Sequence, residues 1–260
     1  MNGLLAWRDE AASGAVNMAA DELLAAEAVR HDRPLVRIYG WQEPTVSLGG
    51  FQRLGDAQAF PGIAGLPIVR RPSGGGAIIH GSDVTYAVAV PRSHAWGGDP
   101  QVLYDAFHEA LVEVLRKQGI TASLHPGRGR DAGDEDRFLC FDRRARGDLV
   151  VRTADSADDH KILGSAQRRL QAAVLQHGSL LEQSSRAVTE DARHPGLHDL
   201  LASAGWGSTA NDLVDPWLLR VAAAAGLRLE WTGESFLATH RPEITAAAPR
   251  FLSQAWLGRR

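Results

Sequence analysis

The sequence predicts one domain of the α+β class that spans residues 1–260. Strand-like and helical runs are both present, but they do not alternate regularly, which disfavours a doubly wound α/β fold. The length allows one large domain or one domain with an appendage, and no internal repeat or low-complexity linker divides the chain. We therefore expect a single domain whose part from about residue 186 onward is mainly helical.

The first half of the chain predicts a helix followed by short strands. Apolar residues recur at helical spacing over residues 14–30, with Asp21, Glu22 and Glu27 between them, which indicates an amphipathic helix. Apolar, β-branched runs bounded by turn residues then predict strands over residues 34–39, 45–48, 67–71, 77–80 and 84–90. Asp99-Pro100 supplies an N-cap and a first-turn proline for a helix that ends near Gln118.

The second half begins with a polar, glycine-rich stretch. Residues 125–137 predict a mobile surface loop. Three further strands are expected, over residues 148–153, 161–168 and 172–181. In the helical remainder, Asp215-Pro216 is expected to cap a second clear helix.

Composition and charge exclude several classes of protein. The net charge of −3 gives no electrostatic footprint for nucleic acid. No run approaches the roughly 18 apolar residues of a membrane span, and the N-terminus lacks a signal-peptide pattern, so we expect a cytoplasmic protein without a membrane anchor. A single cysteine excludes an internal disulfide, and no spacing resembles a metal site, so no metal is expected.

Lysine is scarce in this chain. Only Lys117 and Lys161 are lysines among 28 basic residues, where average composition would supply roughly fifteen. Arginine replaces lysine on a solvated surface, but not where a compact, deprotonatable amine is required. Lys117 lies near the end of a predicted helix, where a cation suits the helix dipole. Lys161 and the single Cys140 are therefore the residues to question.

A glycine-rich turn lies between two predicted strands. Three consecutive glycines follow Arg70, Arg71 and Ser73, and they are costly in a strand unless the backbone is needed there. Exposed N–H groups beside two arginines suit a carboxylate, phosphate or carbonyl. A hairpin turn or bulge is the alternative. The pattern is neither a Walker A loop nor a dinucleotide fingerprint.

Other candidate residues are open to two interpretations. Lys161 begins a strand of small residues and could face an acyl carbonyl or a nucleophile, or it could be a surface lysine. Cys140 lies between apolar residues as a buried thiol, or becomes a nucleophile if a cation approaches it. His177 and His80 could each line a pocket or be satisfied core residues.

Three ordered motifs resemble those of the lipoate-protein ligase A and octanoyltransferase superfamily. They are residues 70–80 (RRPSGGGAIIH), 161–168 (KILGSAQR) and 175–181 (LQHGSLL), while residues 17–22 (NMAADE) and 39–49 are similar to its N-terminal signature. The resemblance covers about residues 14–182. It implies a catalytic domain of the biotinyl/lipoyl protein ligase type, with mixed and antiparallel sheets flanked by helices.

The resemblance also implies which residues bind the substrate. The glycine turn would line a tunnel for a medium-length acyl chain, and Lys161 would contact the acyl carbonyl. The expected substrate-binding residues come from the three motifs: Arg70, Arg71, Ser73, Gly74, Gly75, Gly76, Ala77, His80, Gly164, Ser165, Ala166, His177 and Gly178.

The position of Cys140 resembles that of the cysteine-dependent octanoyltransferases. Cys140-Phe141 lies about twenty residues before Lys161, and residues 166–168 (AQR) are also more similar to transferases. This implies that Cys140 and Lys161 are catalytic, that an octanoyl group from acyl carrier protein passes through a thioester on Cys140, and that no cofactor is needed. One alternative is a lipoate-protein ligase, which would use ATP and Mg and would not need Cys140. A non-enzymatic protein that binds acyl groups or lipoyl domains is the other.

The expected acceptor is a lysine of a lipoyl domain or of the glycine-cleavage H protein, in a ping-pong reaction. Lys161 would stabilise the thiolate, and backbone N–H groups of residues 74–76 would hold the oxyanion. Residues 142–147 replace the family's usual Pro-Ser-x-Tyr/Trp stretch, and their arginines Arg143, Arg144 and Arg146 would contact an acidic carrier protein. We expect a monomer.

Overall fold

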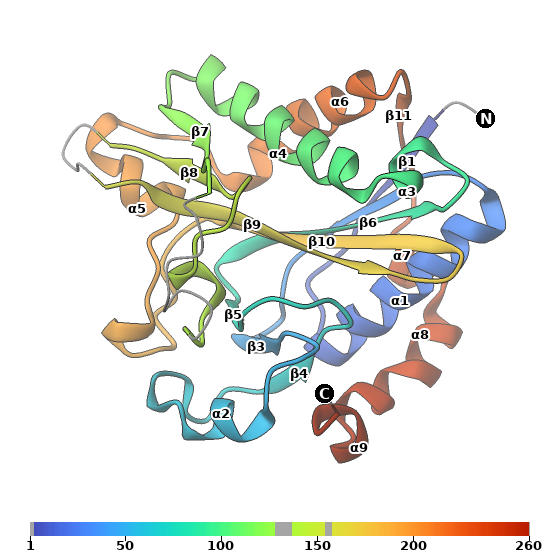
Figure 1. Ribbon diagram of the computed structural model, residues 1–260, viewed down its shortest axis with the longest axis horizontal. Coiled ribbons are helices and arrows are strands. Elements are labelled where there is room, and N and C mark those ends of the chain that lie inside the picture. The colour runs from blue at the N-terminus through green and yellow to red at the C-terminus, as the bar shows by residue number, and fades with distance from the viewer. Residues whose placement is uncertain (1–2, 128–136, 154–157, 260) are drawn as a thin grey trace.

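An eight-stranded mixed sheet forms the centre of the protein (Figure 1). The structure is a computed structural model that describes residues 3–127, 137–153 and 158–259. β1 pairs in parallel with β11 and β2, and the other neighbours pair antiparallel. In spatial order the strands are β11 (Arg228–Trp231), β1 (Gly3–Arg8), β2 (Leu35–Tyr39), β6 (Asp83–Pro91), β10 (Ala173–Leu181), β9 (His160–Arg169), β8 (Leu149–Val151) and β7 (Ala122–Leu124).

Helices cover both faces of this sheet (Figure 1). α4 (Pro100–Lys117) and α6 (Val214–Ala224) pack on one face over a core that includes Phe107 and Trp217. α1 (Gly14–His31), α7 (Phe236–Thr239) and α8 (Arg241–Ala247) pack on the other, around Leu24 and Phe236. The shorter helices are α2 (Leu54–Ala59), α3 (Ala95–Gly98), α5 (Leu197–Leu201) and α9 (Gln254–Leu257).

A second, three-stranded sheet carries the glycine turn. Its order is β4 (Ile68–Arg70), β3 (Thr45–Leu48) and β5 (Ile78–His80), so the turn connects the two outer strands. In Figure 1 this sheet lies on the same side of the large sheet as α1. The predicted α+β class, with a mixed sheet flanked by helices, is confirmed.

The predicted elements appear at nearly the expected residues, with two exceptions. The helix after Asp99 begins at Pro100, and the Asp99 side chain accepts a hydrogen bond from the Gln101 N–H, as a cap should. Asp215 does not cap α6: the helix begins one residue earlier, at Val214, directly after a 3₁₀ turn at Ala210–Leu213. Of the predicted mobile loop, residues 128–136 lie outside the described residues.

The second exception is α1, which is not amphipathic. Asp21 is fully buried and Glu27 nearly so, although both were expected on a solvated face. The helix is enclosed by the sheet, β4 and the C-terminal helices, so its polar residues need buried partners. Among the described residues, no helix combines the length and apolar character needed to cross a membrane.

Candidate active site

The glycine turn and the segment around Cys140 are joined by backbone hydrogen bonds. Ala77 N–H donates to the Phe138 carbonyl (2.9 Å), and Cys140 N–H donates to the Ala77 carbonyl (2.8 Å). A Cβ on Gly76 would lie 2.8 Å from the Cys140 nitrogen. The glycine at this position therefore permits the close approach of Cys140. The sequence predicted that the backbone of the glycine turn is needed for a close contact, and Cys140 makes such a contact from within the protein.

Lys161 reaches the same point from β9. Its Nζ lies 3.8 Å from Cys140 Sγ and donates to the Cys140 carbonyl at 3.2 Å. Cys140 is half-buried, whereas Lys161 is almost fully buried. The two residues expected to be catalytic are thus neighbours, although 21 positions separate them in sequence.

An irregularity in the β8–β9 pairing directs the Lys161 side chain. The register shifts by one residue between Val150, which faces Lys161, and Leu149, which faces Leu163. A bulge of this kind places two successive side chains on one face, and Ile162 and Leu163 are both buried in the α4-side core. Lys161 and Gly164 consequently share the opposite face. A Cβ on Gly164 would lie 2.7 Å from Lys161 Cε, so this glycine makes room for the lysine.

Asp148 completes the cluster, and sequence reasoning did not identify it. Its Oδ2 lies 2.8 Å from Lys161 Nζ and accepts the Ala145 N–H at 2.7 Å. Tyr104 donates to Oδ1 at 3.4 Å, and burial together with the Asp148 charge raises the pKa of Tyr104. The sequence signal was a lone carboxylate immediately before an apolar strand. Such a residue is ordinary at a strand end, so only the fold shows its partner.

Arg71 stabilises the glycine turn through buried hydrogen bonds. Its guanidinium is fully buried and donates to the carbonyls of Gly74 (2.8 Å), Gly76 (2.6 Å) and Ser47 (2.7 Å). Burial lowers the pKa of Arg71 to about 10. Apart from one bond from Arg71 Nη1 to Ser47 Oγ at 3.2 Å, these contacts are to backbone, so the arginine shapes the turn.

Ser73 and His177 meet on the α1 side of the large sheet. Ser73 Oγ and His177 Nε2 are hydrogen-bonded, and both residues are buried. His177 Nδ1 lies 3.6 Å from Asp21 Oδ2 and has no hydrogen-bond partner among the described residues. Burial lowers the pKa of His177. Ser73 of the glycine turn is thereby connected, through His177, to the buried Asp21 of α1.

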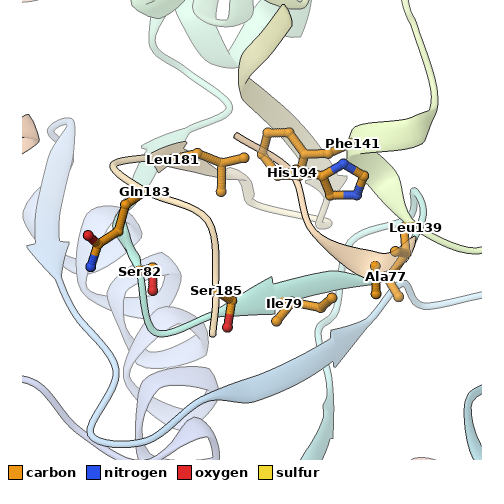
Figure 2. A pocket seen from close by; sticks show the side chains of 10 residues that line it. Ala77, Ile79, Ser82, Leu139, Phe141, Leu181, Gln183, Ser185 and His194 are labelled. Atoms are coloured by element: carbon orange, nitrogen blue, oxygen red, sulfur yellow. The ribbon is translucent and has the colours of Figure 1, made fainter. Parts of the chain in front are cut away.

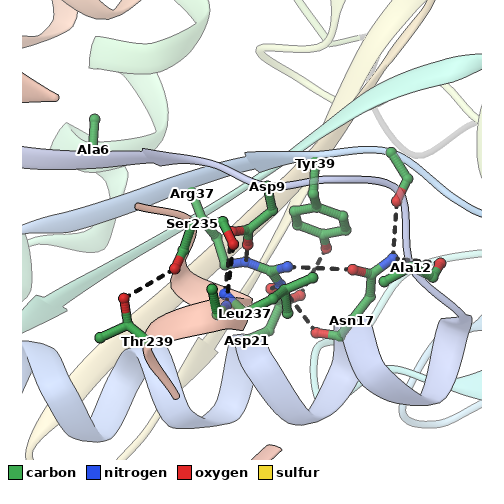
Figure 3. A network of polar contacts seen from close by, with 12 residues as sticks. Ala6, Asp9, Ala12, Asn17, Asp21, Arg37, Tyr39, Ser235, Leu237 and Thr239 are labelled. Atoms are coloured by element: carbon green, nitrogen blue, oxygen red, sulfur yellow. Dashed lines mark hydrogen bonds and ion pairs between the residues drawn. The ribbon is translucent and has the colours of Figure 1, made fainter. Parts of the chain in front are cut away.

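Asp21 belongs to a buried polar network centred on Arg37 (Figure 3). Arg37 donates to Asp21 (2.8 Å) and to Asp9 (2.7 Å), and Tyr39 OH donates to Asp21 at 2.8 Å. Burial alone would lower the pKa of Arg37, but the carboxylates of Asp21 and Asp9 more than offset this and raise it. Sequence reasoning missed this network because it treated Asp21 as a surface residue.

Four residues expected to bind substrate are occupied elsewhere. Arg70 bonds the backbone carbonyls of Leu257 and Gly49. His80 bonds Ser47 and Asp83 and stacks on Trp41 at 3.9 Å. Gly178 is buried and Ser165 half-buried: Ser165 Oγ bonds Tyr86 and His108, each at 2.7 Å, and a Cβ on Gly178 would lie 2.4 Å from Ser165 Oγ. These contacts give all four residues partners within the protein, and their role in substrate binding stays a prediction.

Gly74, Gly75 and Ala166 are also expected to bind substrate. Among the described residues no contact assigns them that role, so it stays a prediction. Gly75 adopts a positive φ of 91°, and a Cβ on Gly74 would contact the Phe51 ring at 3.5 Å. Ala166 pairs with His177 across β9 and β10. No group of three or more metal-binding side chains occurs among the described residues. The candidate site consists of Cys140, Lys161, Asp148 and the glycine turn, which the contacts described above bring together.

The predicted carrier-binding arginines bond to backbone around Cys140. Arg143 Nε donates to the Arg137 carbonyl at 2.7 Å, and Arg144 Nη1 donates to the Phe141 carbonyl at 2.6 Å. Reversing both charges would thus disturb the nucleophile segment as well as any carrier contact.

Solved structures of lipoate ligases share this fold. A bipartite lipoate protein ligase from Thermoplasma acidophilum superimposes with a TM-score of 0.67 over all of this chain and 98% of its own, at 19% identity. A lipoate-protein ligase A bound with ATP gives a TM-score of 0.65 over 99% of this chain and 98% of its own, at 20% identity. At such identities the likeness shows a shared fold.

Curated relatives are more similar in sequence. The octanoyltransferase LipM of Kyrpidia tusciae is 39% identical over 180 residues, and that of Bacillus subtilis is 33% identical over 180 residues. Each alignment covers 65% of this chain and 62% of the relative, so the chain matches less than two thirds of the length of these proteins. The model of the lipoyl protein ligase A/B catalytic domain matches residues 13–196, which include the glycine turn, Cys140, Asp148 and Lys161. The chain therefore belongs to the lipoyl protein ligase A/B catalytic domain family.

Proposed function

We propose that the protein is an octanoyltransferase of lipoate biosynthesis that moves octanoyl from acyl carrier protein to a protein lysine through a thioester on Cys140. The observation that carries this proposal is the separation of 3.8 Å between Lys161 Nζ and Cys140 Sγ. An ammonium beside a cysteine sulfur stabilises the thiolate, which is the nucleophilic form. The similarity to LipM octanoyltransferases supports the same reaction.

In the first half-reaction, the Cys140 thiolate attacks the thioester carbonyl carbon of the donor. The new bond joins Sγ to this carbon, and the bond between the carbon and the carrier sulfur breaks. The departing thiolate takes one proton from Lys161 Nζ, which leaves acyl-Cys140, a neutral Lys161 and a free carrier thiol. Asp148, 2.8 Å from Nζ, keeps the amine in position throughout.

The second half-reaction restores the resting pair. The neutral amine of the acceptor lysine attacks the acyl-Cys140 carbonyl, and the bond from carbon to Sγ breaks. Lys161 accepts the proton that the amine loses, so the thiolate and ammonium form again. The product is an amide on the acceptor, which we propose is a lipoyl domain or the glycine-cleavage H protein, and neither ATP nor a metal enters the balance.

Gly75 N–H is the donor of the glycine turn best suited to the oxyanion. The Gly74 carbonyl accepts a hydrogen bond from Arg71, so it points toward that side chain. In a trans peptide the N–H of Gly75 points the opposite way. Ala77 N–H and Cys140 N–H already bond to carbonyls and are not free for this purpose. A preorganised N–H directed at the developing charge stabilises the tetrahedral intermediate.

Octanoyl carrier protein and mass spectrometry test the proposal. Without ATP, Cys140 should gain about 126 Da, the mass of an octanoyl group less hydrogen, and should lose it when a lipoyl domain is added. Cys140→Ala should show neither event, and Lys161→Met should acylate at least a hundredfold more slowly. Full lipoyl-domain modification by Cys140→Ala that depends on ATP would instead establish a ligase.

A further inference from the structure

Asp148 ends a tight turn that the helix α4 supports. The Asp148 N–H donates to the Ala145 carbonyl at 3.2 Å, and Gly147 between them has a positive φ of 87°, as the third residue of a type II turn requires. His108 of α4 donates from Nδ1 to the Gly147 carbonyl at 2.7 Å. Both residues are buried, so loss of this bond would leave a buried carbonyl to be satisfied. The helix α4 thus holds the backbone directly before the Asp148 carboxylate.

Tyr104, one turn earlier in α4, reaches the same carboxylate. Its ring stacks on His108 with the centroids 4.0 Å apart, and its hydroxyl lies 3.4 Å from Asp148 Oδ1. A Cβ on Gly147 would lie 2.8 Å from Tyr104 Cε1, so the ring covers this glycine directly. Residues four positions apart lie on one face of a helix, and both side chains therefore approach the turn together.

A chain of hydrogen bonds fixes the orientation of the His108 ring. Burial lowers the pKa of His108 to about 3, so the ring is neutral at pH 7, and a proton on Nδ1 leaves Nε2 as an acceptor. Ser165 Oγ then donates to Nε2, and its oxygen accepts the Tyr86 hydroxyl, each at 2.7 Å. Tyr86 in turn accepts from the Gln176 amide at 2.7 Å. Since each hydroxyl has one proton, the direction of every bond in the chain follows from the bond to the Gly147 carbonyl.

The Cys140 segment has little free space on the side of Phe141. Cys140 packs against Phe141 and Leu181. Figure 2 shows the cavity that these two residues help to line, and its volume is about 20 Å³, room for about one water. Because the segment is closely packed here, the distance from Cys140 Sγ to the Lys161 ammonium depends on where Asp148 holds that ammonium.

We propose that Tyr104 and His108 are positioning residues for the Lys161 ammonium and act through Asp148. His108 fixes the turn before Asp148, and Tyr104 orients Oδ1. Oδ2 is then directed at Lys161 Nζ, 2.8 Å away. The inference rests on the proposed function, since it assigns the pair a role in the activation of Cys140.

Two substitutions of His108 separate its two hydrogen bonds. The side-chain amide of His108→Asn can take the place of Nδ1 and donate to the Gly147 carbonyl, whereas that of His108→Gln reaches the place of Nε2 and can accept from Ser165. We expect the single-turnover rate of Cys140 acylation by octanoyl carrier protein to fall about tenfold or more in His108→Gln, but less than about threefold in His108→Asn. Each variant loses one hydrogen bond, so urea unfolding should show similar losses of stability, and the rates are compared where both variants are folded.

Alkylation of Cys140 by iodoacetamide reports the thiolate without an acyl donor. An ammonium displaced from the sulfur stabilises less thiolate, so the pH midpoint of alkylation should rise by about one unit in His108→Gln and stay near the wild-type value in His108→Asn. Equal rates and equal midpoints in the two folded variants would overturn the inference, because His108 would then act only on folding. Failure of octanoyl carrier protein to acylate the wild-type protein would instead remove the proposed function, whereas the alkylation midpoints would still decide the role of His108.

Tyr104→Phe keeps the ring over Gly147 and removes only the hydroxyl beside Asp148. We expect acylation of Cys140 to be about fivefold slower, because the carboxylate loses one of the groups that orient it. In Asp148→Asn protein the same substitution should change the rate by less than about twofold, since two residues that act through one contact do not add their effects. A loss as large in the Asp148→Asn protein as in the wild type would mean that Tyr104 acts by another route, and would contradict the inference.

Discussion

One carboxylate, that of Asp148, keeps the Lys161 ammonium where it meets Cys140. Both members of this ion pair are almost fully buried. A buried charge that loses its partner is left uncompensated, and its side chain moves or changes protonation. The position of Lys161, and with it the thiolate of Cys140, therefore depends on a residue that does not itself touch the sulfur. In this sense Asp148 is a positioning residue.

Asp148→Asn should separate this role from folding. Asparagine keeps the size of the side chain and an acceptor for the Ala145 N–H, but it removes the charge beside Lys161. We expect the single-turnover rate of Cys140 acylation to fall about 10- to 100-fold, part of the 10²–10⁴-fold that positioned proton transfer contributes. Asp159→Asn, which breaks the exposed pair with Arg152 near the same strand, is the control. Similar rates for the two variants would contradict this role.

At the scale of elements, the glycine turn and the Cys140 segment form one unit. The bonds through Ala77 fix the two backbones against each other, and Gly76 is the point of closest approach. A Cβ at this point would meet backbone atoms, which cannot turn aside as a flexible side chain could. The geometry of the nucleophile thus depends on a glycine in the turn between β4 and β5.

Gly76→Ala should displace Cys140 while the protein still folds. The added methyl forces the two segments apart by some tenths of an ångström, and a small misplacement of reacting groups costs up to about 10²-fold in rate. We expect at least tenfold slower acylation, measured by mass spectrometry. Gly98→Ala, where the new Cβ meets nothing within 4 Å, should acylate at the wild-type rate. If Gly76→Ala were acylated as fast as this control, the contact between Gly76 and Cys140 would not determine the position of the nucleophile.

Strand periodicity predicted β9 correctly but did not predict which face its residues occupy beyond the bulge. The sequence predicted a strand over residues 161–168, and simple alternation places Lys161 and Ser165 on one face. The shift opposite Leu149 reverses the alternation, so Ser165 faces His108 and α4 instead. A bulge depends on the partner strand, and residues 161–168 alone do not contain that information. Lys161 and Cys140 could be singled out from the sequence because residue scarcity and motif spacing require no knowledge of strand pairing.

For the whole molecule, long-range pairing was the unpredictable part. β1 and β11 pair in parallel although more than 220 residues separate them, and β11 is a half-exposed edge strand of four residues. Neither has the apolar alternation that identified β6. The buried network of Asp9, Asp21 and Arg37 has the same origin, since it connects the end of β1 with α1 and β2. No local pattern distinguishes Asp21 from its exposed neighbour Glu22.

These two neighbours in α1 allow a matched test of the network. Asp21→Asn leaves the buried Arg37 with Asp9 as its remaining carboxylate, so we expect the free energy of unfolding to fall by about 3 kcal/mol. Glu22→Gln breaks an ion pair with Arg250 that is nearly half exposed, and should cost less than about 1 kcal/mol. Urea unfolding measures both. Because Asp21 also faces His177, whose partner Ser73 begins the glycine turn, Asp21→Asn should slow acylation of Cys140 even under conditions in which the variant is fully folded. Equal unfolding free energies for the two variants would mean that the network contributes no more than a surface pair.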